Sequence, residues 1–269
     1  MKRVIPIVLI AQGRVVLSRN FARHSIQGDP NQILSRLLAW DSDEVIILDI
    51  SRNDRVKNFR DDLKLKPDFN TGSSLTDLTR LSSKLTMTPL SVGGKISNLT
   101  QIEELLSSGA DRVIINSSFS TNRKFCVDAI KEFGGSTIIA SVDYKFYKDD
   151  FKVFIRNGTE CTNTNLVTYC KYVSDLGVSE VLANSIDRDG LGKGFDIEVI
   201  NKLVSHLQTP IIACGGAGKD SDFIEVLQIE GISGAAAANI FHFKENSMYL
   251  LKRNLFESGL PVRKPRIRD

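Results

Sequence analysis

Short apolar runs recur along the chain and alternate with longer runs in which apolar residues repeat at helical spacing. The short runs are rich in β-branched residues and most of them are continuously apolar, which is typical of strands covered on both faces. We predict eight strands, at residues 4–9, 45–49, 89–92, 112–116, 137–143, 180–184, 210–214 and 235–238.

Helical patterns occupy most of the gaps between these strands. Asp29 and Pro30 combine an N-cap residue with a proline at the first helical position, and apolar residues then line one face. Further helical patterns cover residues 99–106, 125–133, 165–176, 197–207, 223–229 and 248–256. Alternating strands and helices predict an α/β fold with a parallel sheet, and eight strands are the number that closes a (β/α)8 TIM barrel.

The two halves of the chain repeat several features. Gly93-Gly94 and Gly215-Gly216 each follow a predicted strand and are 122 positions apart, and hairpin-like segments follow the first and fifth strands, at 12–16 and 151–158. We therefore predict a single barrel domain, residues 1–269, built from two half-barrel repeats at about 1–120 and 121–258. A polar insertion at 55–74 is expected to be a surface loop, and the basic tail at 259–269 a frayed, solvated end.

Composition narrows the range of functions. The 269 residues carry 35 Lys and Arg against 32 Asp and Glu, a net charge of +3, which is too near neutral to favour a nucleic-acid-binding protein. The four cysteines match neither a metal pattern nor a disulfide framework, and the apolar N-terminal run is far too short to span a membrane. We expect a cytoplasmic protein with reduced thiols, without a metal, cofactor, nucleic-acid or membrane requirement.

The carboxyl ends of the strands are where a TIM barrel carries its chemistry. Both Gly-Gly pairs lie there, and glycine allows backbone N–H groups to approach an oxyanion closely. Asn116, Ser117 and Asn239 end the strands that follow the two pairs. This arrangement predicts two phosphate sites related by a pseudo-twofold axis and a ligand with a phosphate at each end; ordinary turns are the alternative.

Asp143 is the strongest candidate for a general acid or base. It follows a fully apolar run, so its carboxyl group should lie at a buried strand end, where it is costly unless used or paired. A structural role as a loop anchor is the alternative. Leu9 occupies the matching position on the first strand, where an acid would be needed to complete a symmetric pair.

The chain resembles the HisF family, the cyclase subunits of imidazole glycerol phosphate synthase. The resemblance covers nearly the whole chain and is carried by the segments at 13–16, 48–50, 92–94, 109–113, 140–145, 185–190, 211–219 and 235–243. It implies a TIM barrel with a HisH-like glutaminase on its amino-terminal face. It also implies that ammonia passes through the barrel to a phosphoribulosyl aminoimidazole substrate and that the reaction yields imidazole glycerol phosphate.

The resemblance assigns functions to individual positions. Asp143 falls on one catalytic aspartate, and Asp49 and Asp189 fall on polar positions of the substrate site. Leu9 falls on the second catalytic aspartate and Leu17 on a lysine of the family, so cyclisation is in doubt because leucine cannot transfer a proton. The positions that fall on the two phosphate sites are Gly94, Asn116, Ser117, Gly215, Gly216, Ala238 and Asn239.

The opposite end of the barrel keeps the family pattern. The ring of charges that the family uses as an ammonia gate falls on Arg3, Glu44, Arg112 and Glu180, although such a ring could serve stability alone. This combination resembles a HisF-like subfamily that supplies ammonia, with a HisH-like glutaminase and a sugar amidotransferase, for acetamidino groups on surface polysaccharides. The alternatives are a working cyclase of histidine biosynthesis and a non-enzymatic scaffold that activates the glutaminase.

Overall fold

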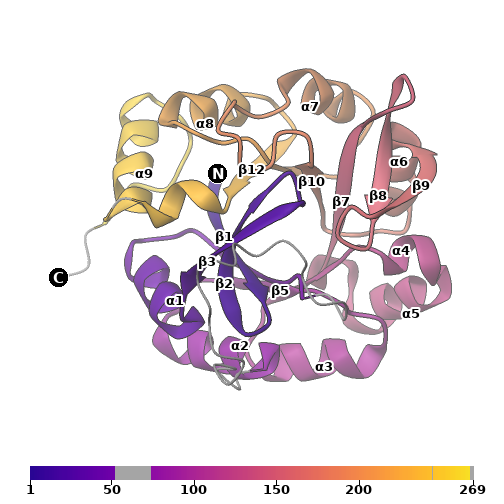
Figure 1. The fold of residues 1–269 in the computed structure, drawn as a ribbon, viewed down its shortest axis with the longest axis horizontal. Coiled ribbons are helices and arrows are strands. Elements are labelled where there is room, and N and C mark those ends of the chain that lie inside the picture. The colour runs from indigo at the N-terminus through magenta and orange to yellow at the C-terminus, as the bar shows by residue number, and fades with distance from the viewer. Residues whose placement is uncertain (52–73, 244, 267–269) are drawn as a thin grey trace.

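Eight parallel strands form a closed barrel in the computed structural model, which describes residues 1–51, 74–243 and 245–266. The strands follow the order β10-β11-β12-β1-β4-β5-β6-β7, and pairing of β7 with β10 closes the ring (Figure 1). The barrel strands are β1 (Arg3–Ala11), β4 (Val45–Asp49), β5 (Leu90–Gly93), β6 (Arg112–Ile115), β7 (Ile138–Tyr147), β10 (Glu180–Ser185), β11 (Ile211–Cys214) and β12 (Ile232–Ala237). The predicted (β/α)8 TIM barrel is therefore confirmed.

Helices surround the barrel (Figure 1). They are α1 (Pro30–Ala39), α2 (Leu75–Leu85), α3 (Leu99–Ser107), α4 (Ser118–Thr121), α5 (Arg123–Phe133), α6 (Leu166–Asp175), α7 (Ile197–Val204), α8 (Asp220–Leu227) and α9 (Ser247–Glu257). Asp29 caps α1 as predicted and accepts hydrogen bonds from the backbone N–H groups of Asn31 and Gln32. Helix α2 was not predicted, although Ser74 and Asp77 form a capping box at its start.

The chain has two separate apolar cores. One lies between the helices and the outside of the barrel, and the other fills the inside of the barrel. The inner core consists of Ile5, Ile7, Ile46, Ile114, Ile139, Leu182, Ile212, Cys214 and Ala236, with Leu9, Leu48 and Ala238 packed against it. Both faces of the strands are thus covered by apolar side chains, which explains why their sequences are continuously apolar.

Two antiparallel hairpins extend from the carboxyl end of the barrel. Strand β1 continues into β2 (Arg14–Arg19) and β3 (Arg23–Gly28), and strand β7 continues into β8 (Asp150–Ile155) and β9 (Glu160–Asn165). Both predicted hairpin segments are therefore present, and they belong to β1 and β7, which occupy equivalent places in the two halves. Several strand boundaries differ from the prediction, most of all at β7, which does not end at Asp143 but runs on to Tyr147, because its last residues pair with β8.

The basic C-terminal tail is ordered as far as residue 266, so the prediction of a frayed end was wrong for this part. Val262 is buried and forms a parallel bridge with Lys2, beside the start of β1. The guanidinium of Arg263 lies 2.7 Å from Asp41 Oδ1 and 3.0 Å from Asp43 Oδ1, and the buried ammonium of Lys252 contacts the same two carboxylates. The two aspartates that pair with Lys252 and Arg263 are more than 200 residues away in the sequence. The composition of the tail therefore could not reveal that these ion pairs hold it in place.

Two further sequence expectations can be compared with the structure. All four cysteines are unpaired, and Cys126, Cys170 and Cys214 are buried. No helix among the described residues is long and apolar enough to cross a membrane. The predicted insertion at 55–74 lies outside the described residues, apart from Ser74.

Candidate active site at the carboxyl end of the barrel

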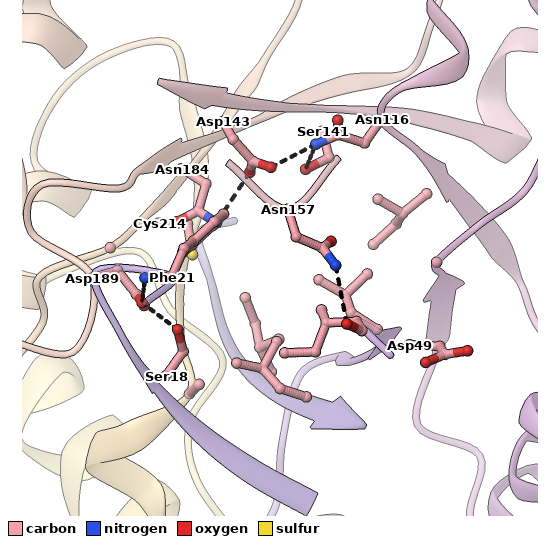
Figure 2. Close-up of a pocket in the computed structure, with 18 of the residues that line it drawn as sticks. Ser18, Phe21, Asp49, Asn116, Ser141, Asp143, Asn157, Asn184, Asp189 and Cys214 are labelled. Atoms are coloured by element: carbon pink, nitrogen blue, oxygen red, sulfur yellow. Dashed lines mark hydrogen bonds between the residues drawn. The ribbon is translucent and has the colours of Figure 1, made fainter. Parts of the chain in front are cut away.

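A cavity of about 850 Å³ opens at the carboxyl end of the strands (Figure 2). Its floor includes Ile7 and Ile114 of the inner core, and its walls come from both halves of the barrel. Apart from Gly93 and Leu17, the residues that the sequence placed on the catalytic and phosphate-binding face line this cavity: Leu9, Asp49, Gly94, Asn116, Ser117, Asp143, Asp189, Gly215, Gly216, Ala238 and Asn239.

Asp143 points into this cavity from β7 (Figure 2). Its carboxyl group is buried and accepts hydrogen bonds from Asn116 Nδ2 at 2.8 Å and Asn184 Nδ2 at 3.3 Å. Burial is the main cause that raises the pKa of Asp143 to about 7, the two amide bonds oppose this, and the charge of Asp189 adds to it. A carboxyl group with this pKa exchanges protons near neutral pH, as a general acid or base must.

Asp189 is a second, partly buried acid of the cavity. It accepts hydrogen bonds from Ser18 Oγ at 2.6 Å and from the backbone N–H of Phe21 at 3.2 Å (Figure 2). Burial raises the pKa of Asp189, and these two donors partly oppose the rise. Its carboxylate therefore holds the hairpin formed by β2 and β3 against the loop that follows β10.

Leu9 lies on the cavity wall at the position equivalent to Asp143. The pairing register relates them: Leu9 is three residues beyond Pro6, which pairs with Ala237, and Asp143 is three residues beyond Ala140, which pairs with Ile115. The two partners are 122 residues apart, the same separation as the Gly-Gly pairs. The lumen thus carries an aliphatic side chain where a symmetric pair would have a second carboxyl group.

Leu17, which falls on a lysine of the family, does not line the 850 Å³ cavity. Side chains alternate between the faces of β2: Ser18 borders this cavity and also a second one behind the hairpin, whereas Leu17 lines only the second. Its side chain therefore does not face the reaction cavity in this conformation of the hairpin.

The glycines after β5 and β11 occupy crowded positions. A Cβ atom on Gly94, which has a φ of +115°, would lie 2.2 Å from the carbonyl oxygen of Asp49, and one on Gly216, with a φ of +104°, would lie 2.1 Å from the carbonyl oxygen of Gly194. Any side chain would collide with the backbone at both places. The two pairs therefore bring backbone close to the cavity in each half of the barrel.

The polar side chains at the predicted phosphate sites are already engaged. Ser117 Oγ accepts a hydrogen bond from the backbone N–H of Arg156 at 3.0 Å, and Asn239 Nδ2 donates to the carbonyl oxygen of Ser18 at 2.9 Å. The remaining oxygen, Asn239 Oδ1, is buried without a hydrogen-bond partner among the described residues, as is Asn184 Oδ1. These two acceptors are therefore available to donor groups of a ligand or to water.

The two hairpins brace the cavity in the same way. Asn20, at the tip of the first hairpin, donates from Nδ2 to the carbonyl oxygen of Ile186, and Asn157, at the tip of the second, donates to the carbonyl oxygen of Ile50 at 3.0 Å. Ile186 follows β10 and Ile50 follows β4, so each hairpin reaches across to the other half of the barrel. This reciprocal contact supports the predicted pseudo-twofold relation.

Several cavity residues were not anticipated. Arg156 and Asn157 enter from the tip of the second hairpin, and Ser141 and Asn184 surround Asp143 from neighbouring strands. Lys95, directly after the first Gly-Gly pair, has a φ of +60° and places its ammonium 3.3 Å from Asp49 Oδ2. The Asn157-Gly158 turn signal locates a hairpin, but nothing in the sequence indicates that its tip would fold over the cavity.

The opposite end of the barrel carries a closed ring of ion pairs. Arg3 and Arg112 each bridge both Glu44 and Glu180, and the bond from Arg3 to Glu44 measures 2.7 Å. Both carboxylates are nearly inaccessible, with side-chain exposures of 1% and 8%. Burial tends to raise the pKa of Glu180, but the two guanidinium groups and a hydrogen bond from Ser233 bring it below its ordinary value. The four predicted gate residues therefore meet where β1, β4, β6 and β10 begin.

Comparison with known proteins identifies the origin of this barrel. The histidine biosynthesis protein family matches residues 3–247. The chain is 34% identical over 262 residues to imidazole glycerol phosphate synthase subunit HisF of Sulfurisphaera tokodaii, covering 97% of this chain and 98% of the relative. The chain belongs to the HisF family. The chain is also similar to the HisF subunits of Hydrogenobaculum sp. (34% identical over 263 residues) and Clostridium botulinum strain Okra (33% identical over 264 residues). Both alignments cover 97% of this chain and 98% of the relative.

Proposed function

We propose that this HisF-family chain is the synthase-type subunit of a glutamine amidotransferase complex and receives ammonia from a HisH-like glutaminase on its amino-terminal face. The ion-pair ring supports this proposal because it lies on the barrel axis, at the end where a glutaminase would dock. Opening one pair, such as Arg3 with Glu180, would admit a small molecule to the lumen.

The lumen suits ammonia rather than ammonium. Between the ring and Asp143 the inner core consists of aliphatic side chains, including Ile5, Ile46 and Leu182. An apolar passage disfavours a charged ammonium ion, because the ion would lose its hydration without gaining a partner. Neutral ammonia avoids this cost, so the passage would deliver the nucleophilic form to the cavity at the carboxyl end.

The cavity supports a function other than independent cyclisation. The observation that carries this proposal is the aliphatic side chain of Leu9 on the cavity wall, at the position equivalent to Asp143. Asp143 can still accept or donate one proton near neutral pH, but a reaction that needs two opposed acids lacks one of them. We propose that the chain passes ammonia to a sugar amidotransferase that builds acetamidino groups for surface polysaccharides.

A working cyclase of histidine biosynthesis is the second candidate. Asp189 favours it, because this partly buried acid shares the cavity with Asp143 and interacts with it electrostatically. As a substitute acid it would provide the second proton-transfer group. In this case the substrate would be phosphoribulosyl formimino aminoimidazole carboxamide ribotide, with its phosphates at the two Gly-Gly sites.

A cyclisation assay distinguishes the two candidates. The purified complex with a HisH-like glutaminase would be given glutamine and the phosphoribulosyl substrate, and imidazole glycerol phosphate would be quantified. We expect little product from the natural chain and a gain of about tenfold or more in Leu9→Asp, since a general acid or base contributes roughly 10²–10⁴ in rate.

Leu48→Asp is the matched control for this gain. Leu48 pairs directly with Leu9 in the barrel and also lines the cavity, so it receives the same charge at a neighbouring position. We expect no gain in this variant. Product formed by the natural chain at the rate of an ordinary cyclase would refute the ammonia-delivery proposal in favour of histidine biosynthesis.

The scaffold alternative predicts a different response. If the chain only activates the glutaminase, altering the ring at Arg3 or Glu180 should leave glutaminase stimulation unchanged and should have no effect on ammonia transfer. We expect instead that Glu180→Gln alters the fraction of ammonia that reaches an acceptor at the carboxyl end rather than escaping into solvent.

A further inference from the structure

A second cavity of about 1120 Å³ lies behind the hairpin formed by β2 and β3. The hairpin separates it from the reaction cavity, and Ser18, Gly190 and Asn239 line both. Its other walls come from the loops that follow β10 and β11 and from the segment after β12, including Leu191, Gly192, Gly218, Ile240 and Phe243. Leu17, which falls on a lysine of the family, lines this cavity and not the reaction cavity.

One face of the hairpin forms its basic wall. Alternate residues of β2 and β3 point to the same side, and the side that faces the second cavity carries Leu17, Arg19, Arg23, Ser25 and Gln27. His24, which has partial exposure, also contributes to the wall. No Asp or Glu lines the cavity among the described residues.

Arg19 and Arg23 are directly opposite each other in the hairpin register. Like charges at such a cross-strand pair repel and destabilise a hairpin, so the pair costs stability unless an anion lies between the two groups. Within the described residues, no carboxylate forms an ion pair with either guanidinium. The repulsion therefore remains uncompensated by the protein itself.

The backbone that carries the arginine pair is anchored. The backbone N–H of Asn20, in the turn between the two arginines, donates to the carbonyl oxygen of Asp189 at 2.9 Å, and its side chain donates to the carbonyl oxygen of Asp187 at 3.0 Å. Ser18, next to Arg19, donates from Oγ to Asp189, and its carbonyl oxygen accepts from Asn239. The anchored turn therefore keeps two exposed arginines beside the second cavity, where both guanidinium groups can reach a multiply charged anion.

An exposed aromatic ring completes the cavity. Phe243 has 73% of its surface exposed and lies on the wall contributed by the segment after β12. Large apolar side chains on a folded surface are ordinary when isolated, but here the ring shares a cavity with two unpaired cations. A ligand with both a planar organic part and an oligophosphate would contact all three side chains.

We propose that the second cavity binds the diphosphate group of an organic ligand of the nucleoside diphosphate class. Arg19 and Arg23 hold the phosphoryl oxygens by charge-assisted hydrogen bonds, Phe243 stacks against the base, and the rest of the ligand extends past Ser18 and Asn239 toward the reaction cavity. This site borders one predicted phosphate site at Asn239, but Arg19, Arg23 and Phe243 do not line the reaction cavity, and the proposal does not depend on whether the barrel conducts ammonia.

Calorimetric titration of the full chain tests the proposal, with inorganic pyrophosphate and UDP as separate probes. We expect both to bind, UDP more tightly, with affinities that fall as salt concentration rises. Arg19→Gln with Arg23→Gln should weaken pyrophosphate binding by about tenfold or more, because each arginine provides a charge-assisted hydrogen bond. Phe243→Ala should weaken UDP binding and leave pyrophosphate binding unchanged.

Arg156→Gln is the control for location. Arg156 is an exposed arginine that lines the reaction cavity and pairs with Glu160. If the anion binds behind the hairpin, removal of this charge should change the pyrophosphate affinity less than twofold, because solvent and salt screen charges at separate sites. A larger loss in Arg156→Gln than in the double variant would put the anion in the reaction cavity and overturn the proposal. Absence of binding of both probes would also overturn it.

Folding of the double variant is checked by its melting temperature without ligand. Since the two arginines repel each other, the melting temperature should stay the same or rise. Arg19→Lys with Arg23→Lys, which keeps both charges, should retain most of the affinity. If binding is lost equally in the lysine and glutamine variants while the fold is unchanged, the charge-based proposal is wrong; if affinity follows charge, it is supported.

Discussion

Glu180→Gln removes one of the two carboxylates that hold the ring at the amino-terminal end of the barrel. Glu180 accepts hydrogen bonds from Arg3, Arg112 and Ser233, and only 8% of its side chain is exposed. Glutamine has nearly the same shape, so the substitution removes the charge without opening a cavity. Arg3 and Arg112 then share Glu44 as their remaining acidic partner in the ring.

The expected loss in stability follows from this geometry. Breaking a fully buried ion pair costs about 3–5 kcal/mol because the partner is left buried and unpaired. The two arginines keep Glu44 and have 23% and 17% of their side chains exposed, so they retain both a partner and some hydration. We therefore expect a loss of about 2–3 kcal/mol, which corresponds to a fall in melting temperature of about 4–12 °C for a chain of this size.

Urea denaturation of the isolated chain measures this loss. Glu160→Gln is the matched control, because Glu160 forms an exposed pair with Arg156 that should contribute no more than about 1 kcal/mol. The pKa of Glu180 is lower in the folded chain than in the unfolded chain. Its charge therefore stabilises the fold at pH values above the ordinary pKa of glutamate, and this stabilisation is lost as the pH falls through the pKa of the folded chain. The difference in free energy of unfolding between the natural chain and Glu180→Gln should therefore become smaller at acidic pH. Equal losses in Glu180→Gln and Glu160→Gln would refute the argument that the ring is a buried, cooperative network.

Two further predictions concern the cavity at the carboxyl end. Asp143 has a folded pKa raised to about 7 by burial, so it remains protonated in the folded chain from about pH 4 to 7 while the unfolded chain ionises, and stability falls over this range. Differential scanning calorimetry should therefore find Asp143→Asn similar to the natural chain at pH 4 and more stable at pH 8; no change with pH would contradict the raised pKa. Gly94→Ala should lower the free energy of unfolding, measured by urea denaturation, by about 2 kcal/mol or more, because its Cβ would collide with the backbone of Asp49. Gly177→Ala, at a positive φ but with open space around it, should lower it by about 1 kcal/mol. Equal losses would show that the backbone at Gly94 shifts to accommodate the methyl group.

The barrel was predictable because each strand is defined by a local pattern. Apolar runs buried on both faces produced all eight barrel strands, and the cap at Asp29 and Pro30 located α1. Helix α2 was missed because it directly follows the polar insertion, and its apolar positions are few. The ends of β1 and β7 were placed too early, since pairing with the hairpins extends both strands beyond the barrel.

Site residues were predictable only as positions on the carboxyl face. Gly-Gly pairs and Asp143 follow apolar runs, so the fold class alone brings them to one end of the barrel. The sequence does not show that Asn116 and Asn184 would donate to Asp143, or that Leu17 would face the second cavity. These relations depend on register and on which face of a strand each side chain occupies, and neither is a property of a short segment.

The amino-acid sequence by itself determined the number of strands, the separation of 122 residues between the Gly-Gly pairs and the aliphatic residue at Leu9, because these are properties of composition and spacing along the chain. Only the tertiary structure decided that four charges at separate strand starts form one closed ring, that Asp143 has a pKa of about 7, and that Arg19 and Arg23 share a cavity. Each of these depends on the distances between groups and on the water excluded around them, which are fixed only when remote segments pack together.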